Sequence, residues 1–229
     1  MSRLAAAVLL ALSCLAPLTV EAGAVDLPLQ VGGAFSVPAT SLREARFAAT
    51  LRQQYDFSCG SAALATLLTH HYRYPVGEDQ VFVEMFRVGD QAKIQVEGFS
   101  LLDMKRYLEA HGFTADGFQE PLDKLAQAGI PAIVLINEAG YNHFVVVKGL
   151  RDGRVLFGDP AGGTRAMPVA DFDAIWGNKI LFVISNRQNE AGFNLASDWR
   201  VAPAAPLGRS QVHDSMAPAH LPKFGPGDF

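Results

Sequence analysis

One cysteine in this 229-residue sequence stands where a nucleophile is expected. Cys59 directly precedes a run of small and apolar residues, GSAALATLL, which predicts a buried helix beginning at or near the cysteine. A cysteine in the first turn of a helix faces unpaired backbone N–H groups and the positive end of the helix dipole, and both favour the thiolate. Because the thiolate is the reactive form, Cys59 is a candidate nucleophile with a lowered pKa.

Cys59 has two other interpretations, half of a disulfide and a small buried apolar residue. The other cysteine of the sequence, Cys14, lies in a segment that we expect to be removed on export. An intramolecular disulfide is therefore not expected in the mature chain. The buried-residue interpretation stays open here, because a lone cysteine before a helix is weak evidence of catalysis.

A cysteine nucleophile needs a base, and the base needs a group that orients it. His143 opens an apolar strand, HFVVVKGL, and Asp159 closes the next strand, RVLFGD. Each has an ordinary explanation, a polar residue at a strand start and a turn signal before proline. However, Asp152-Gly153 predicts a hairpin turn between these strands, which puts both residues at the same end of the hairpin. We therefore expect Cys59, His143 and Asp159 to form a catalytic triad.

Attack on an amide carbonyl also creates an oxyanion, which preorganised hydrogen-bond donors must stabilise. The backbone N–H of Cys59 is one expected donor. The side-chain amides of Gln53 and Gln54 lie just upstream, and either could supply the second. The residue pattern by itself does not choose between them.

The elements that must position these residues divide the chain into a helical half and a strand-rich half. Besides the helix at Cys59, helices are predicted over 41–53, 78–88, 100–112, 120–129 and 168–177. A polar loop is expected between Gly89 and Gly98. Strands rich in β-branched and aromatic residues are predicted over 130–136, 143–150, 154–159 and 179–185. This pattern predicts an α+β fold with an N-terminal helical half packed on a C-terminal antiparallel sheet.

Three segments are expected along the chain. Residues 1–24 combine Arg3, a short apolar stretch and small residues, which is typical of a secretory signal peptide and predicts a periplasmic protein. Residues 25–188 are expected to form the catalytic domain. Residues 189–229 are rich in proline and poor in large apolar residues, and we expect an extended or disordered tail.

Composition and missing motifs exclude several classes of function. The net charge of -4 and the lack of a basic stripe give no basis for nucleic-acid binding. The sequence has no G-x-x-x-x-G-K-[ST] motif, so no ATP-binding domain is expected in this chain. It has no H-E-x-x-H motif and no second cysteine after signal removal, so we expect neither a metal site nor another cofactor.

These residues resemble the motif of the C39 family of cysteine peptidases, a branch of the papain-like fold. The family pattern is a glutamine shortly before Asp-Cys-Gly, a helix of small residues, a later strand with histidine, and then Asp-Pro. The matching positions are Gln53, Cys59, Gly60, His143 and Asp159. The resemblance implies that Gln53, rather than Gln54, is the oxyanion donor. Ser58 departs from the pattern, because the family usually has aspartate there.

Two stretches, RQQYDFSCGSAALATLLTHHY and SLLDMKRYLEAHGF, resemble a narrower group of the family. The members of this group are exported and serve functional-amyloid secretion. This similarity implies an exported thiol protease that hydrolyses a peptide bond in a secreted protein. Its partners would be a protein or peptide substrate, with amyloid subunits or secretion-system components as candidates. Two alternatives remain: a non-catalytic peptide-binding chaperone on the same fold, and an acyltransferase that uses an amine instead of water.

Overall fold

The computed structural model describes residues 24–28 and 34–203, which fall into two units, residues 1–41 and 42–229. In the first unit, β1 (Ala24–Pro28) pairs antiparallel with β2 (Ala34–Pro38). Residues 1–23 of the predicted signal peptide lie outside the described residues. None of the helices in the described part of the chain is long and apolar enough to cross a membrane.

The second unit carries the predicted helices and strands. Its helices are α1 (Leu42–Phe47), α2 (Cys59–Thr66), a π-helical turn (Leu67–His71), α3 (Glu78–Val88), α4 (Gln91–Glu97), α5 (Leu101–Ala110), α6 (Asp123–Ala128), α7 (Val169–Ile175), a 3-10 turn (Gln188–Glu190) and α8 (Ala196–Trp199). Its strands are β3 (Ala115–Gln119), β4 (Ala132–Glu138), β5 (Tyr141–Arg151), β6 (Arg154–Asp159), β7 (Gly163–Pro168) and β8 (Ile180–Ile184). The strands form one antiparallel sheet in the order β3-β8-β4-β5-β6-β7.

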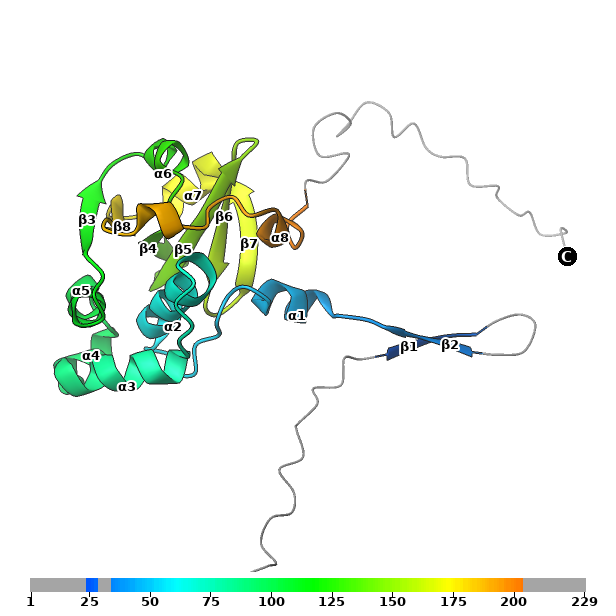
Figure 1. The fold of residues 1–229 in the computed structure, drawn as a ribbon, viewed down its shortest axis with the longest axis horizontal. Helices are drawn as coiled ribbons and strands as arrows, with labels where there is room; N and C mark the ends of the chain where they lie inside the picture. Colours follow the sequence, from blue (N-terminus) through cyan, green and yellow to red (C-terminus); the bar gives the residue numbers. More distant parts are fainter. Residues whose placement is uncertain (1–23, 29–33, 204–229) are drawn as a thin grey trace, which may run out of the picture. The chain divides into compact units, whose positions relative to one another are not determined.

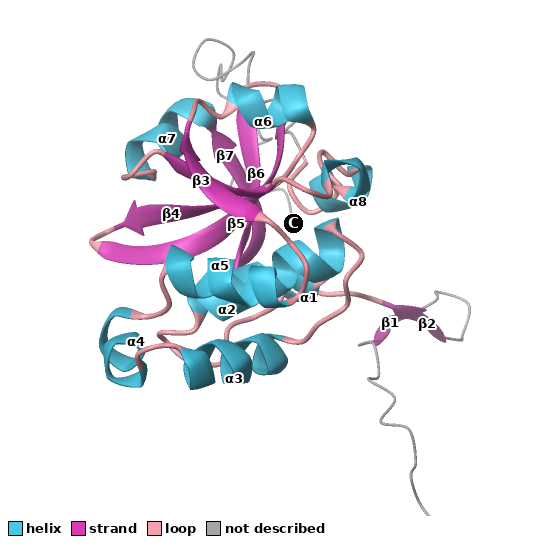
Figure 2. Ribbon diagram, turned by 60° about the vertical axis from the view of Figure 1, so that its left-hand side comes forward, coloured by secondary structure: helices cyan, strands magenta, loops and turns pink. Residues whose placement is uncertain are grey.

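The sheet is covered by helices on both faces, with α2, α3 and α5 on one face and α6 and α7 on the other (Figure 2). Successive side chains of a strand point to opposite faces. On β5, Phe144 and Val146 therefore join the core under α2, whereas Val145 and Val147 join the core under α6 and α7. This explains why the central strands are apolar without interruption, and it confirms the predicted α+β class.

Helix α2 lies directly against β5 at the centre of the domain (Figure 1). All of its residues are buried, and most are small, which lets its backbone approach the sheet closely. Gly60 is required for this approach, because a Cβ atom there would lie only 2.9 Å from Cβ of Phe99. The small-residue run after Cys59 is therefore a packing requirement.

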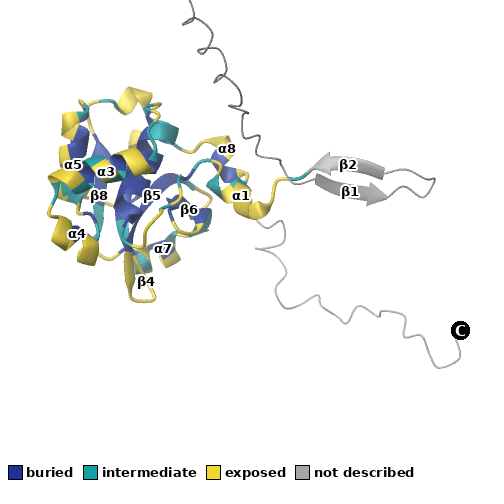
Figure 3. Cartoon of the chain, turned by 90° about the horizontal axis from the view of Figure 1, so that it is seen from below, coloured by how far each residue is buried: buried dark blue, intermediate teal, exposed yellow. Residues whose placement is uncertain are grey.

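The β4–β5 hairpin ends in an exposed tip (Figure 3). Ala139 and Gly140 form its two-residue turn with φ of 53° and 86°, the left-handed combination that suits the twist of antiparallel strands. Asn137 fixes this turn by accepting a hydrogen bond from Gly140 N at 3.2 Å and by donating one to the Asn142 side chain at 2.6 Å. The first residues of β5 are thus held in register.

One predicted loop is a helix in the structure. The stretch between Gly89 and Gly98 forms α4, and the side chain of Asp90 caps it by accepting a hydrogen bond from Lys93 N at 3.2 Å. The loop prediction was wrong because the two glycines mark the ends of a helix. Strands β3 and β7 were also not predicted, because neither has a run of β-branched residues.

The predicted tail begins too early. Residues 190–203 pack on the domain (Figure 1). In α8, Trp199 is 3% exposed and Asp198 is 4% exposed. Oδ2 of Asp198 lies 3.5 Å from the buried Nζ of Lys148, and Asn194 N donates to Lys148 O at 2.8 Å. For this segment the disordered alternative was wrong, because tertiary burial of an aromatic residue and an ion pair orders it against the domain. Residues 204–229 lie outside the described residues.

Candidate active site

Cys59 is the first residue of α2 and is 7% exposed. Its sulfur faces the backbone N–H groups of Gly60 and Phe144, which favour the thiolate, as expected at a helix start. Burial outweighs them and raises the pKa of the Cys59 thiol above its ordinary value. The predicted lowering of this pKa is therefore wrong, since removal from water disfavours the charged thiolate.

His143 and Asp159 come together at one end of the β5–β6 hairpin. Nε2 of His143 lies 3.5 Å from Oδ1 of Asp159, and both side chains are almost completely buried. Burial lowers the pKa of His143, which the charge of Asp159 partly offsets. Neither ring nitrogen, Nδ1 or Nε2, has a hydrogen-bond partner in the described part of the chain, and both are buried. His143 is followed directly by Phe144, whose N–H faces the Cys59 sulfur, so the backbone of β5 passes beside the thiol at this point.

The carboxylate of Asp159 is held from several sides. Its Oδ1 accepts hydrogen bonds from the backbone N–H groups of Ala161 at 2.9 Å and Gly162 at 3.2 Å, which close the turn after β6. Its Oδ2 accepts a hydrogen bond from Nη2 of Arg165 at 3.0 Å. These three hydrogen bonds fix the carboxylate between the turn after β6 and strand β7.

Arg165 and Glu138 are site residues that the sequence reasoning missed. The guanidinium of Arg165 forms a two-pronged ion pair with Glu138, at 3.1 and 2.5 Å, while it also contacts Asp159. The guanidinium carbon lies 4.7 Å from the centre of the Phe157 ring. Arg165 lies on the unpredicted strand β7, so only the charge itself could have drawn attention to it.

Gln53 lies beside the turn that contains Asp159. Its backbone N–H donates to Pro160 O at 3.2 Å, and its Nε2 donates to Tyr55 O at 3.0 Å. Gln54, the other candidate, is exposed. The structure thus brings the Gln53 backbone to the residue that follows Asp159.

The departure at Ser58 has a local explanation. Ser58 is fully buried, and its hydroxyl exchanges hydrogen bonds with Tyr55 N and O at 3.1 Å each. The buried carboxyl of Glu78 lies close by and accepts a hydrogen bond from Ser61 at 2.8 Å. Burial raises the pKa of Glu78, and the Ser61 and Ser58 hydroxyls oppose this shift. An aspartate at position 58 would bring a second carboxylate to the same buried place, whereas serine satisfies the loop without charge.

A groove with a volume of about 610 Å³ opens at Cys59. One wall consists of α4, with Ile94, the link at Phe99 and the start of α5. The other wall consists of Leu135, Asn142 and Phe144 of the β4–β5 hairpin. The groove has an apolar floor and charged residues along its rim, a composition that suits an extended peptide. The segment that the sequence analysis read as a loop therefore forms one wall of this groove.

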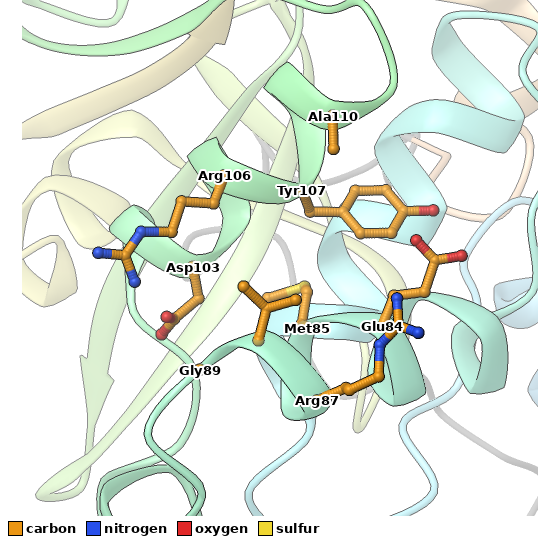
Figure 4. A pocket seen from close by; sticks show the side chains of 9 residues that line it. Glu84, Met85, Arg87, Gly89, Asp103, Arg106, Tyr107 and Ala110 are labelled. Atoms are coloured by element: carbon orange, nitrogen blue, oxygen red, sulfur yellow. The ribbon is translucent and has the colours of Figure 1, made fainter.

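A second cavity of about 130 Å³ lies between α3 and α5 (Figure 4). Met85 and Tyr107 line it, and the side chain of Arg106 extends along its edge. Its lining includes none of the three candidate triad residues, so we place the active site in the larger groove.

Comparison with protein families shows which family has this set of site residues. The model of the peptidase C39 family matches residues 48–188, which include Gln53, Cys59, His143 and Asp159. The chain belongs to the peptidase C39 family. It is therefore a cysteine peptidase, as the sequence predicted.

Two C39 relatives are similar over most of this chain. One is the probable functional amyloid protease FapD of Pseudomonas aeruginosa, 38% identical over 221 residues, with 95% of each chain covered. The other is the probable functional amyloid protease FapD of Pseudomonas fluorescens, 42% identical over 164 residues, which covers 71% of this chain and 72% of the relative. Among solved structures, the peptidase domain of Streptococcus ComA matches with a TM-score of 0.50 and 19% identity over 59% of this chain and 96% of that domain. This likeness supports the C39 peptidase fold.

Proposed function

We propose that this C39 peptidase cleaves an exported protein substrate, with Cys59 as nucleophile, His143 as base, Asp159 as orienting acid and Gln53 as oxyanion donor. The observation that carries the proposal is the position of Cys59, which lies at a helix start and opens onto the groove. The contact between His143 and Asp159 supports the same assignment.

The resting site holds a neutral thiol and a neutral imidazole at pH 7, because burial raises the pKa of Cys59 and lowers the pKa of His143. His143 accepts the thiol proton as the sulfur attacks the scissile carbonyl carbon. The carbonyl oxygen becomes an oxyanion, which the Cys59 N–H and the Gln53 amide stabilise. The C–N bond then breaks, His143 donates its proton to the leaving amine, and water hydrolyses the thioester.

Each supporting residue has a distinct electrostatic role. Asp159 stabilises the imidazolium that forms during attack and fixes the orientation of the ring, as in other triads. Loss of one oxyanion donor typically lowers the rate by about 10²–10³-fold, so Gln53 is expected to be important but not essential.

We also propose that the substrate belongs to a functional-amyloid secretion system and that cleavage takes place in the periplasm. The names of the two relatives with 38% and 42% identity support the amyloid assignment. The signal-peptide pattern of residues 1–24 supports export. Amyloid subunits and secretion-system components are the substrates and partners that we would examine first.

The test is a search for new protein N-termini. Secreted proteins from cells that carry Cys59→Ala are incubated with purified wild-type protein, and new N-termini are labelled and sequenced. We expect new termini with the wild type and none with Cys59→Ala or His143→Ala, while His111→Ala at the end of α5 behaves like the wild type. If Cys59→Ala produces the same termini, or if secretion in the Cys59→Ala strain is normal in every protein, the peptidase proposal is wrong. Normal secretion that is lost only on deletion of the whole chain would indicate a chaperone.

A further inference from the structure

Tyr141 lies at the tip of the β4–β5 hairpin, two residues before His143 on the same strand. Its ring meets the His143 ring edge to face, with centres 5.6 Å apart and an angle of 88° between planes. Its hydroxyl leaves the hairpin and donates a hydrogen bond to Asp56 O at 2.8 Å. Tyr141 therefore joins the strand of His143 to the segment that precedes Cys59.

This preceding segment, residues 53–58, is called the Gln53 loop. On its apolar side, the rings of Tyr55 and Phe57 pack against Phe82 of α3, with centres 5.1 and 5.9 Å away. On its polar side, Gln53 N donates to Pro160 O at 3.2 Å. The hydroxyl of Tyr141 supplies a second polar attachment, at Asp56 O.

The phenol oxygen also lies close to the reacting groups. Burial raises the pKa of Tyr141, and the charges of Cys59 and Asp56 raise it further. The amide of Gln53 is close enough to the phenol to oppose this shift by hydrogen bonding. Gln53 Nε2 is thus directed into the space between Tyr55 O, Asp56 O and the Tyr141 hydroxyl.

We propose that Tyr141 is a positioning residue for the oxyanion site, because its hydroxyl holds the Gln53 loop against the strand of His143. The inference rests on the proposed function, in which Gln53 donates to the oxyanion. An amide on a loop is an efficient oxyanion donor only if its place is fixed before the reaction, because reorganisation during attack costs free energy. Without the Tyr141 hydroxyl, the Gln53 loop loses its hydrogen bond from β5 to Asp56 O.

The test separates the oxyanion site from the reactivity of Cys59. A short peptide aldehyde ending in glycinal forms a hemithioacetal: sulfur bonds to the carbonyl carbon, and the thiol proton ends on the former carbonyl oxygen. That oxygen occupies the oxyanion site, so its binding depends on Gln53. Iodoacetamide alkylates the sulfur by displacing iodide and forms no oxyanion, so its rate does not depend on Gln53.

We expect Tyr141→Phe, which keeps the aromatic ring, to weaken aldehyde binding by about tenfold, as for loss of one well-made hydrogen bond. We expect no change in the alkylation rate of Cys59. Tyr74 lies away from the groove, so Tyr74→Phe should change neither aldehyde binding nor the alkylation rate. In a Gln53→Ala background, Tyr141→Phe should have almost no further effect, because it acts through Gln53.

Three results with the variants would overturn the inference. They are aldehyde binding unchanged by Tyr141→Phe, an equal loss in aldehyde binding and alkylation, and an additive effect of Tyr141→Phe and Gln53→Ala. A wild-type chain that is alkylated at Cys59 but does not bind the aldehyde would also overturn it. None of these measurements requires a natural substrate, so absence of proteolysis would contradict the proposed function without deciding this inference.

Discussion

Nη2 of Arg165 lies 3.0 Å from Oδ2 of Asp159, while Oδ1 of the same carboxylate lies 3.5 Å from Nε2 of His143. Arg165 is itself fixed by its two-pronged contact with Glu138. Strand β7 and the end of β4 therefore determine together how the carboxylate meets the imidazole. Arg165 also places a positive charge near His143, and this charge lowers the pKa of the imidazole, although less than burial does.

Replacement of Arg165 by glutamine should change the pH profile of the enzyme. Loss of the positive charge raises the pKa of His143, so the base becomes protonated at higher pH. We therefore expect the acid limb of the kcat/KM profile to move to higher pH. We also expect the pH-independent value of kcat/KM to fall about tenfold, because the Asp159 carboxylate loses its contact with Arg165 and orients the imidazole less well. Arg165→Lys should keep the limb near its wild-type position, because it keeps the charge. Arg87→Gln makes the same charge change on α3 and is the control. If Arg165→Gln leaves the acid limb of kcat/KM where it is in the wild type, Arg165 has no electrostatic effect on His143.

The two buried reacting groups predict different pH dependences for peptide hydrolysis and for alkylation. Burial lowers the pKa of His143 below its ordinary 6.5, so kcat/KM should fall only when the pH drops below that value. Burial raises the pKa of Cys59 above its ordinary 9.0, so alkylation by iodoacetamide should still be accelerating at pH 9. Stopped assays of both rates from pH 4 to 10 test this. An alkylation rate that levels off near neutral pH would indicate a preformed thiolate instead.

Truncation within the predicted tail should separate its ordered part from the rest. A chain that ends at Asn189 lacks Asp198 and leaves the Lys148 ammonium without its carboxylate partner, with only the neutral oxygens of Ala49, Thr50 and Thr164 around it. We expect this truncation to cost at least about 3 kcal/mol of unfolding free energy, the usual effect of breaking a buried ion pair. A chain that ends at Pro203 should unfold like the full chain. Denaturant unfolding of both measures the difference, and equal stability would mean that residues 190–203 contribute nothing.

The stability of the protein should fall steeply in mild acid because of His71. Burial lowers the pKa of His71 to about 3, and its Nδ1 donates to Gly192 O at 2.7 Å. The unfolded chain binds a proton on this residue below pH 6.5, whereas the folded chain does not until about pH 3. The unfolding free energy should therefore decrease by about 1.4 kcal/mol per pH unit between these values from this residue alone.

The variant His71→Gln isolates this contribution. It should be less stable at pH 7 but should lose stability less steeply between pH 6 and pH 4. His111→Gln, at the end of α5, should keep the wild-type slope. A wild-type slope in His71→Gln would show that other groups cause the acid sensitivity.

Much of the fold could be predicted because its signals are local. The run after Cys59 and the stretch 100–112 predict helices that the structure contains, and Asp152-Gly153 predicts the β5–β6 turn. Strand β7 and helix α8 could not be predicted, because their own residues have weak preferences. Strand β7 forms because β6 offers it an edge, and α8 forms because Trp199 and Asp198 are buried against the domain.

The sequence by itself determined the family, the nucleophile candidate and the end of the hairpin at which His143 and Asp159 meet. These three features depend on short motifs and on strand and turn patterns. Such signals are local, because residues that are neighbours in the sequence encode them. Tertiary structure alone decided the protonation of the site, because the pKa values of Cys59 and His143 depend on how much water the surrounding elements exclude. It also decided the roles of Arg165 and Tyr141, since each acts on a residue that is distant in sequence and adjacent only after folding.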